Sequence, residues 1–208
     1  LFEYWTTRRG ARAAPNRTDI EPADIRALLP HVLICDLTSD NQMSFRLAGT
    51  ALCSLCGREL KGSAFGSLWL NDGVRNASRT GVSVASRATP AVLSLDCLTT
   101  GGRVAQAEML LLPITGPTGE HDRLIGVLSL FKPPFWVGHD PLAGFSTTGI
   151  RFIDSSREPV FRRQGFASPG SARNTQSGAS GRARRRTARL TCFRHPNAYP
   201  LLTMTGLG

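Results

Sequence analysis

Residues 91–131 read AVLSLDCLTTGGRVAQAEMLLLPITGPTGEHDRLIGVLSLF. At the start of this stretch apolar and polar residues alternate: Leu93, Leu95 and Cys97 with Ser94 and Asp96. This is the period-2 pattern of a strand with one covered face. Turns rich in glycine follow at residues 100–102 and 116–119. The pattern predicts three consecutive antiparallel strands at residues 82–98, 103–114 and 124–131, with Pro90 dividing the first or marking a bulge.

Two more strands are predicted ahead of this region. Residues 32–37 are nearly all apolar, and residues 43–50 follow them after the sequence TSDN, whose side chains favour turns. Short helical pieces are expected next at residues 52–56 and 64–70, and then a helix from Asn71 or Asp72 to Gly81. Residues 32–135 are therefore predicted to form a core, a five-stranded antiparallel sheet with short helices on one face.

The first 31 residues are predicted to be a helical segment. Residues 1–17 carry three aromatic residues ahead of an arginine-rich stretch, which favours a short helix with an aromatic face: Phe2, Tyr4 and Trp5. A second helix is expected to enter at residues 19–22, where a proline fits the first turn, and to end at Pro30. We expect the three aromatic residues to be exposed and to contact a partner or a second copy of the chain.

The C-terminal quarter differs in composition from the rest. Residues 136–157 hold too few apolar residues for a second core, so they are expected to pack back on the first as an extension. Residues 158–208 are predicted to be a disordered, arginine-rich tail, because Gly, Ser, Ala and Arg cannot bury enough surface to offset the entropy of ordering. Residues 157–208 contain ten arginines and one acid, so they account for nearly all of the formal charge of +10.

Several motifs carry a resemblance to a known family. They occur in order along about residues 1–155: Tyr4-Trp5, Pro15-Asn16-Arg17-Thr18-Asp19-Ile20-Glu21-Pro22, Leu28-Leu29-Pro30, Phe45-Arg46-Leu47-Ala48-Gly49-Thr50, Gly57-Arg58-Glu59-Leu60-Lys61-Gly62, Leu110-Leu111-Leu112-Pro113 and Asp122-Arg123-Leu124-Ile125-Gly126. Through these residues the chain resembles a branch of short PAS-domain proteins common in alphaproteobacteria. The resemblance implies an α+β fold of the PAS type and a sensory or regulatory role in bacterial signal transduction.

We therefore expect a non-catalytic module in which a small ligand or a change of redox state alters association with a signalling partner or with a second copy, as a homodimer. No side chains stand in a recognisable catalytic motif, so no catalytic residue is predicted. The absence of a secretory signal and of an apolar run near 20 residues leads us to expect a cytoplasmic protein without a transmembrane segment.

Arg46 interrupts a strand of apolar and small residues, and two interpretations are open. It can point to solvent or pair with Asp36 on the neighbouring strand. Alternatively it helps to hold a polar or anionic ligand near the helical pieces, in a site whose polar and apolar members are Arg46, Thr50, Arg58, Leu68 and Trp69.

Cysteines and histidines give no cofactor prediction. Cys53 and Cys56 have C-x-x-C spacing, but no second half of a zinc site follows, so two small buried thiols are favoured over a redox or metal role. The four histidines do not favour haem, since they fall in helix ends, turns or the tail: His31, His121, His139 and His195. No metal and no cofactor are predicted.

The basic tail supports an alternative function of a different class. A cluster of arginines there could bind nucleic acid or an anionic membrane surface without sequence preference: Arg182, Arg184, Arg185 and Arg186.

Overall fold

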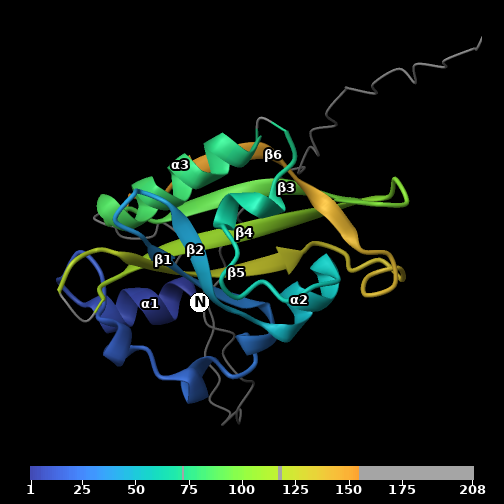
Figure 1. Ribbon diagram of the computed structural model, residues 1–208. Coiled ribbons are helices and arrows are strands. Elements are labelled where there is room, and N and C mark those ends of the chain that lie inside the picture. The colour runs from blue at the N-terminus through green and yellow to red at the C-terminus, as the bar shows by residue number, and fades with distance from the viewer. Residues whose placement is uncertain (72, 117–118, 155–208) are drawn as a thin grey trace, which may run out of the picture. The chain divides into compact units, whose positions relative to one another are not determined.

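The computed structural model describes residues 1–71, 73–116 and 119–154 (Figure 1). Its helices are α1 (Phe2–Arg9), α2 (Thr50–Cys56) and α3 (Gly73–Ser86), and its four short 3-10 turns are Arg17–Asp19, Pro22–Ile25, Leu29–His31 and Phe65–Leu68. Its strands are β1 (Val32–Leu37), β2 (Met43–Ala48), β3 (Ala91–Thr99), β4 (Val104–Ile114), β5 (Arg123–Leu130) and β6 (Leu142–Phe152). No helix among the described residues is both long and apolar enough to cross a bilayer.

The strands form one antiparallel sheet in the order β2-β1-β5-β4-β3-β6. Two strands, a group of helices and then the three strands β3, β4 and β5 follow one another along the chain, as the sequence predicts, and a fourth strand, β6, comes after them. The predicted α+β class is confirmed, with an antiparallel sheet, short helices on one face and an N-terminal helix. The predicted tail lies outside the described residues.

One face of the sheet is covered by α2, α3 and the Phe65–Leu68 turn (Figure 1). The alternating residues of β3 explain this packing, because Leu93, Leu95 and Cys97 all point into this layer and are fully or almost fully buried. α3 adds one apolar stripe at helical spacing: Ala77, Thr80, Gly81, Val84 and Ala85. This layer is the larger of the two cores.

α1 and the 3-10 turns that follow it lie on the opposite face of the sheet (Figure 1). Trp5 is completely buried there, and its indole N–H donates a hydrogen bond of 2.7 Å to the carbonyl oxygen of Pro113 in β4. Ile34, Leu112 and Ile125 from three neighbouring strands belong to the same buried cluster. The N-terminal segment is therefore part of the folded domain.

The sheet has six strands, where five were predicted. Residues 142–152, expected only to pack back as an extension, pair along β3 from Ala91–Phe152 to Thr99–Leu142. The segment has few large apolar residues, so its composition did not indicate a strand. An edge strand, however, needs few such residues. Of the residues in β6 only Gly144 and Phe145 are fully buried.

Two predicted boundaries were also wrong. α3 continues to Ser86, so residues 82–86 are helical and β3 begins only at Ala91. The run Val82-Ser83-Val84 fits a strand period locally, but Val84 and Ala85 continue the buried stripe of the helix. Residues 19–30 form separate 3-10 turns rather than one helix.

Candidate functional site

An apolar pocket of about 420 Å³ lies between α2, the segment ahead of β1, and the end of β5. Its lining comes from these elements, from the connection between β5 and β6, and from the residue ahead of α1: Leu1, Leu28, His31, Ala51, Leu52, Leu55, Val127, Leu128, Ser129, Leu130, Pro133 and Val137. A cavity of this size falls within the usual range for small-molecule sites, about 300–1,000 Å³.

The pocket exists because β5 extends beyond β1. The pairing of β1 with β5 starts at Val32–Val127, whereas β5 pairs with β4 up to Leu130. Residues 128–130 therefore have a strand neighbour on one side only among the described residues, the Leu29–His31 turn contacts β5, and α2 packs against this turn. α2 turns its Leu52 and Leu55 inward and ends at Gly57, whose left-handed φ of 64° suits a helix terminus.

The lining is almost free of polar groups. Ser129 and His31 supply its polar side chains, and no lysine, arginine, aspartate or glutamate lines it. Because an unpaired charge would be costly to bury against such walls, the pocket favours an uncharged, mostly apolar molecule with one or two hydrogen-bonding groups.

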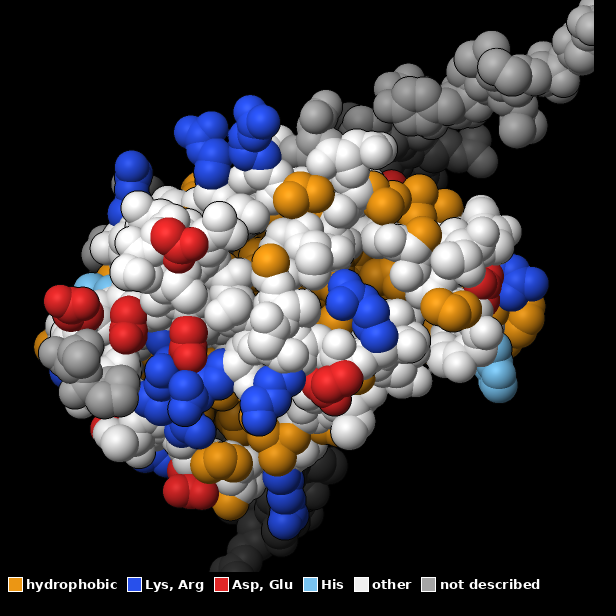
Figure 2. All heavy atoms as spheres, viewed as in Figure 1, with side chains coloured by type: hydrophobic (Ala, Val, Ile, Leu, Met, Phe, Trp, Pro, Cys, Tyr) orange, Lys and Arg blue, Asp and Glu red, His pale blue; other side chains and the backbone are white. Residues whose placement is uncertain are grey.

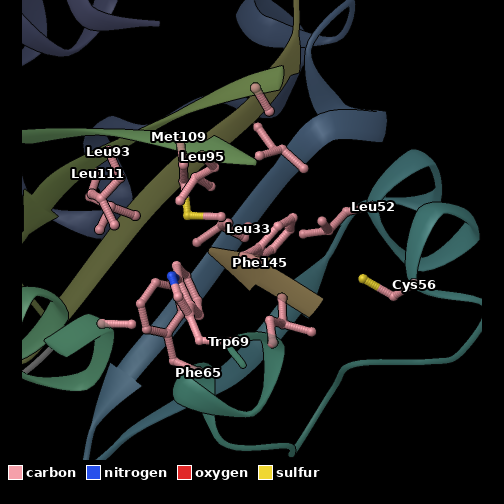
Figure 3. Packing of buried hydrophobic residues seen from close by; sticks show 14 of the residues in the cluster. Leu33, Leu52, Cys56, Phe65, Trp69, Leu93, Leu95, Met109, Leu111 and Phe145 are labelled. Atoms are coloured by element: carbon pink, nitrogen blue, oxygen red, sulfur yellow. The ribbon is translucent and has the colours of Figure 1, made fainter. Parts of the chain in front are cut away.

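Buried side chains, several of them aromatic, pack together in the layer under α3. Figure 3 shows Phe65, Trp69 and Phe145 gathered in this layer. Neighbouring ring centroids are 5.7 Å apart for Phe45–Phe65, 4.8 Å for Phe65–Trp69 and 5.3 Å for Trp69–Phe145. The Trp69 indole N–H also donates to the hydroxyl of Thr147 in β6, at 2.8 Å.

Arg46 lies outside the pocket. Its guanidinium pairs with Asp36 on β1 at 3.1 Å, and 59% of its side chain is exposed. Asp36 is held by a second guanidinium, that of Arg123, whose residue is buried. The structural interpretation of Arg46, pairing with Asp36, is thereby confirmed.

The other four predicted ligand residues do not converge on one cavity. Leu68 and Trp69 are packed in the core, and Arg58 points along the surface, 3.4 Å from the Ser67 hydroxyl. Thr50 is exposed at the start of α2 and borders a separate groove. Ligand contact by these residues stays a prediction that the arrangement does not favour.

The predicted partner residues of α1 are used within the domain. Trp5, expected to be exposed, is buried, and that expectation is wrong because the sheet offers it a hydrogen-bond acceptor and an apolar surface. Phe2 stacks on Trp5 with centroids 6.1 Å apart, and the hydroxyl of Tyr4 accepts a 2.8 Å hydrogen bond from the Glu21 backbone N–H. Both are half-buried. The tail arginines 182, 184, 185 and 186 lie outside the described residues.

The cysteines of the described residues are free thiols. Burial raises the pKa of Cys56 to about 11 and that of Cys97 to about 12, and it raises the pKa of Cys35 well above its usual value. The pKa of Cys53 is raised less strongly, again mainly by burial, with Glu59 nearby at 3.7 Å. Raised thiol pKa values oppose redox chemistry, because the thiolate is the reactive form.

We expect the Cys56 thiol to react slowly with iodoacetamide at pH 7.5. A pKa near 11 leaves a thiolate fraction of roughly 3 in 10,000, against about one tenth for a free cysteine, so alkylation should be at least about 100-fold slower. The rate should rise about tenfold per pH unit up to pH 10. Peptide-resolved mass spectrometry of the native chain measures it, with guanidinium-unfolded protein as control. Alkylation as fast as in the unfolded chain would restore the redox interpretation.

Sequence reasoning did not find the pocket. Leu52 and Leu55 were expected only as part of a short helix, and Leu128 and Leu130 only as part of a strand. Their apolar character was visible, but the hollow between them depends on the offset between β1 and β5. No local residue pattern predicts such an offset between two strands.

The strand order, the helices on one face and the sequence now point to the same family. A model of the PAS domain family matches residues 1–129. No curated protein matches the chain.

The solved structures to which the chain is similar are remote in sequence. One is a light-oxygen-voltage domain in a study of a flavin analogue, with 12% identity, a TM-score of 0.42, and coverage of 53% of this chain and 83% of that one. Another is a PAS domain from Colwellia psychrerythraea, with 13% identity, a TM-score of 0.40, and coverage of 53% and 98%. A third is the PAS domain of an HTR-like protein from Haloarcula marismortui, with 18% identity, a TM-score of 0.38, and coverage of 52% and 90%. Because the family match covers more than half of its length, the chain belongs to the PAS domain family, a family of sensory modules.

Proposed function

We propose that this PAS domain is a non-catalytic regulatory module of bacterial signal transduction. A small, mostly apolar ligand enters the pocket between α2 and the end of β5, and its binding changes how the domain associates with a signalling partner or with a second copy. The observation that carries this proposal is the pocket itself, whose walls are almost entirely apolar and include no aspartate, glutamate, lysine, arginine or cysteine side chain.

The packing around α2 offers a route from the pocket to the surface. α2 contacts the connection that leads into β6: a side chain at Gly57 would come within 3.0 Å of Pro141, and one at Gly138 within 3.4 Å of the Ser54 hydroxyl. Val137 of the same connection lines the pocket. A ligand that binds one position of α2 better than another would therefore shift this connection as well, by a change in populations.

The proposal can be tested with 1-decanol as the probe. We expect saturating 1-decanol to raise the melting temperature, because a ligand that binds only the folded state stabilises it. Decanoate should bind at least about tenfold more weakly, since no lysine or arginine side chain lines the pocket and a carboxylate is costly to bury against apolar walls. Differential scanning fluorimetry and isothermal titration calorimetry measure the two effects, and sedimentation velocity measures association with and without 1-decanol.

Two substitutions locate the binding. Ala51→Phe fills the pocket from the surface of α2 and should weaken 1-decanol binding at least about tenfold, whereas Leu47→Phe adds a ring on exposed β2 and should leave it unchanged. Equal binding by the Ala51→Phe variant would place the ligand elsewhere. Sedimentation that is unaffected by a bound ligand would remove the regulatory part of the proposal.

The alternative of polyanion binding through the tail arginines rests on the sequence alone. It predicts a steep dependence on salt, and nothing in the described residues favours it over the ligand-dependent module.

A further inference from the structure

The outer edge of β6 is open along its second half. β6 is the last strand of the sheet, and residues near its start are covered, since the Leu70 N–H donates to the carbonyl oxygen of Phe145 at 3.1 Å and the Trp69 indole binds Thr147. Residues 148–152 have no strand neighbour on that side among the described residues. An unpaired edge of this kind is a template for another strand.

The opposite edge of the sheet is arranged differently. At β2 the Phe45 N–H donates to Ser63 at 2.9 Å, and its carbonyl oxygen accepts from Gly62 at 2.7 Å, so residues 62–63 cover that edge. β2 is also shorter, with 6 residues against 11 in β6. The open edge of β6 is thus the better place for an added strand.

Apolar side chains line the open edge at alternate positions. Ile150 and Phe152 pair with Leu93 and Ala91, so they share the face that α3 covers, and they are 43% and 49% exposed. Val74 at the start of α3 is 40% exposed and borders the same groove, which has a volume of about 820 Å³. An incoming strand would find contacts for every second side chain here.

The rim of this groove is basic. α3 contributes Arg75 and Arg79 to the lining, Arg87 follows directly after the helix, and no acidic residue lines the groove. None of the three arginines forms an ion pair within the part of the chain that the structure describes. Figure 2 shows basic side chains standing on the surface over α3.

We propose that this groove binds an extended acidic segment of a partner protein, which adds to the sheet as a strand beside β6. Its apolar residues contact Ile150 and Phe152, and its carboxylates face the arginines of the rim. The chain's own residues 157–208 are a poor occupant, because ten arginines and one acid would be repelled by this rim. A nucleic acid would use the arginines but neither the open backbone edge nor the apolar side chains. The proposal goes beyond the ligand pocket and needs no ligand.

The probe is a fluorescein-labelled decapeptide of alternating glutamate and valine, and its binding to the full chain is followed by fluorescence anisotropy. We expect saturable binding that weakens in 0.5 M NaCl, because the charges lie at the surface. The double variant Arg75→Ala/Arg79→Ala should weaken binding about tenfold. Arg26→Ala removes an exposed arginine from a different groove and should change nothing.

Changes on the peptide side test the strand addition without altering the protein. Two peptides are N-methylated at alternate residues, each along one of its two backbone edges, which keeps the charge but removes the donors of that edge. We expect the form whose methylated edge faces β6 to bind at least about tenfold more weakly, and the other form to bind like the parent peptide. The lysine–valine decapeptide should not bind.

Three outcomes would overturn the proposal. One is no binding of the glutamate–valine peptide up to 1 mM. Another is equal affinity for both N-methylated forms, each blocking one edge. The third is tighter binding of a labelled 20-nucleotide single-stranded RNA with the same dependence on Arg75 and Arg79, which would make the surface a polyanion site.

Discussion

Replacing Trp5 by alanine is expected to lower the free energy of unfolding by about 3–5 kcal/mol, the usual range for truncating a buried tryptophan. Trp5 is fully buried between α1 and the sheet, and its indole N–H donates to the Pro113 carbonyl. The substitution leaves a cavity and removes that donor. It should also release Phe2, whose ring stacks on the indole.

Urea denaturation followed by circular dichroism measures this loss. Trp5→Phe keeps most of the ring and loses the hydrogen bond, so it should cost less, about 1–2 kcal/mol. Glu3→Ala is the matched control, since Glu3 lies exposed on the same helix. A Trp5→Ala variant within about 1 kcal/mol of the parent would mean that α1 does not dock on the sheet.

The position of Trp5 shows what the sequence could and could not predict. Tyr4-Trp5 was recognised as a motif, and a short helix with an aromatic face was predicted correctly. Whether that face meets the domain or a partner depends on a free acceptor in β4, over 100 residues away, and no local pattern contains that information. The structure gives the motif an intramolecular role.

The hairpin of β1 and β2 was predictable because its signals are local. Residues 32–37 are nearly all apolar, and the turn-forming residues that follow them mark where the chain reverses. The pairing of Arg46 with Asp36 was one of the interpretations that the sequence left open, since Asp36 lies on the paired strand. The apolar pocket was not predictable, because it results from the ends of elements that meet only in the folded domain.

The sequence did not predict β6, because this strand lacks the local pattern that made the hairpin predictable. Its exposed residues resemble a loop in composition, and the strand is held by pairing with β3 and by Phe145 rather than by its own pattern. Both proposals depend on this strand, because it carries the open edge and follows the connection that lines the pocket.

Replacing Trp69 by alanine is the second substitution with a large expected effect, about 3–5 kcal/mol of unfolding free energy. Trp69 lies between Phe65 and Phe145, and its indole holds the Thr147 hydroxyl. It therefore joins the segment ahead of α3 to β6. Besides global destabilisation, we expect loss of this residue to loosen β6 locally.

Hydrogen exchange separates the two effects. In Trp69→Ala the amides of residues 145–152 should lose more protection than those of β4, because the centre of the sheet keeps both neighbours. Thr147→Val removes only the hydroxyl and should cost about 1 kcal/mol, and in a Trp69→Phe background its cost should largely vanish. Equal loss of protection in β4 and β6 would show that Trp69 supports the core as a whole. β6 would then have no mobility separate from that of the rest of the sheet.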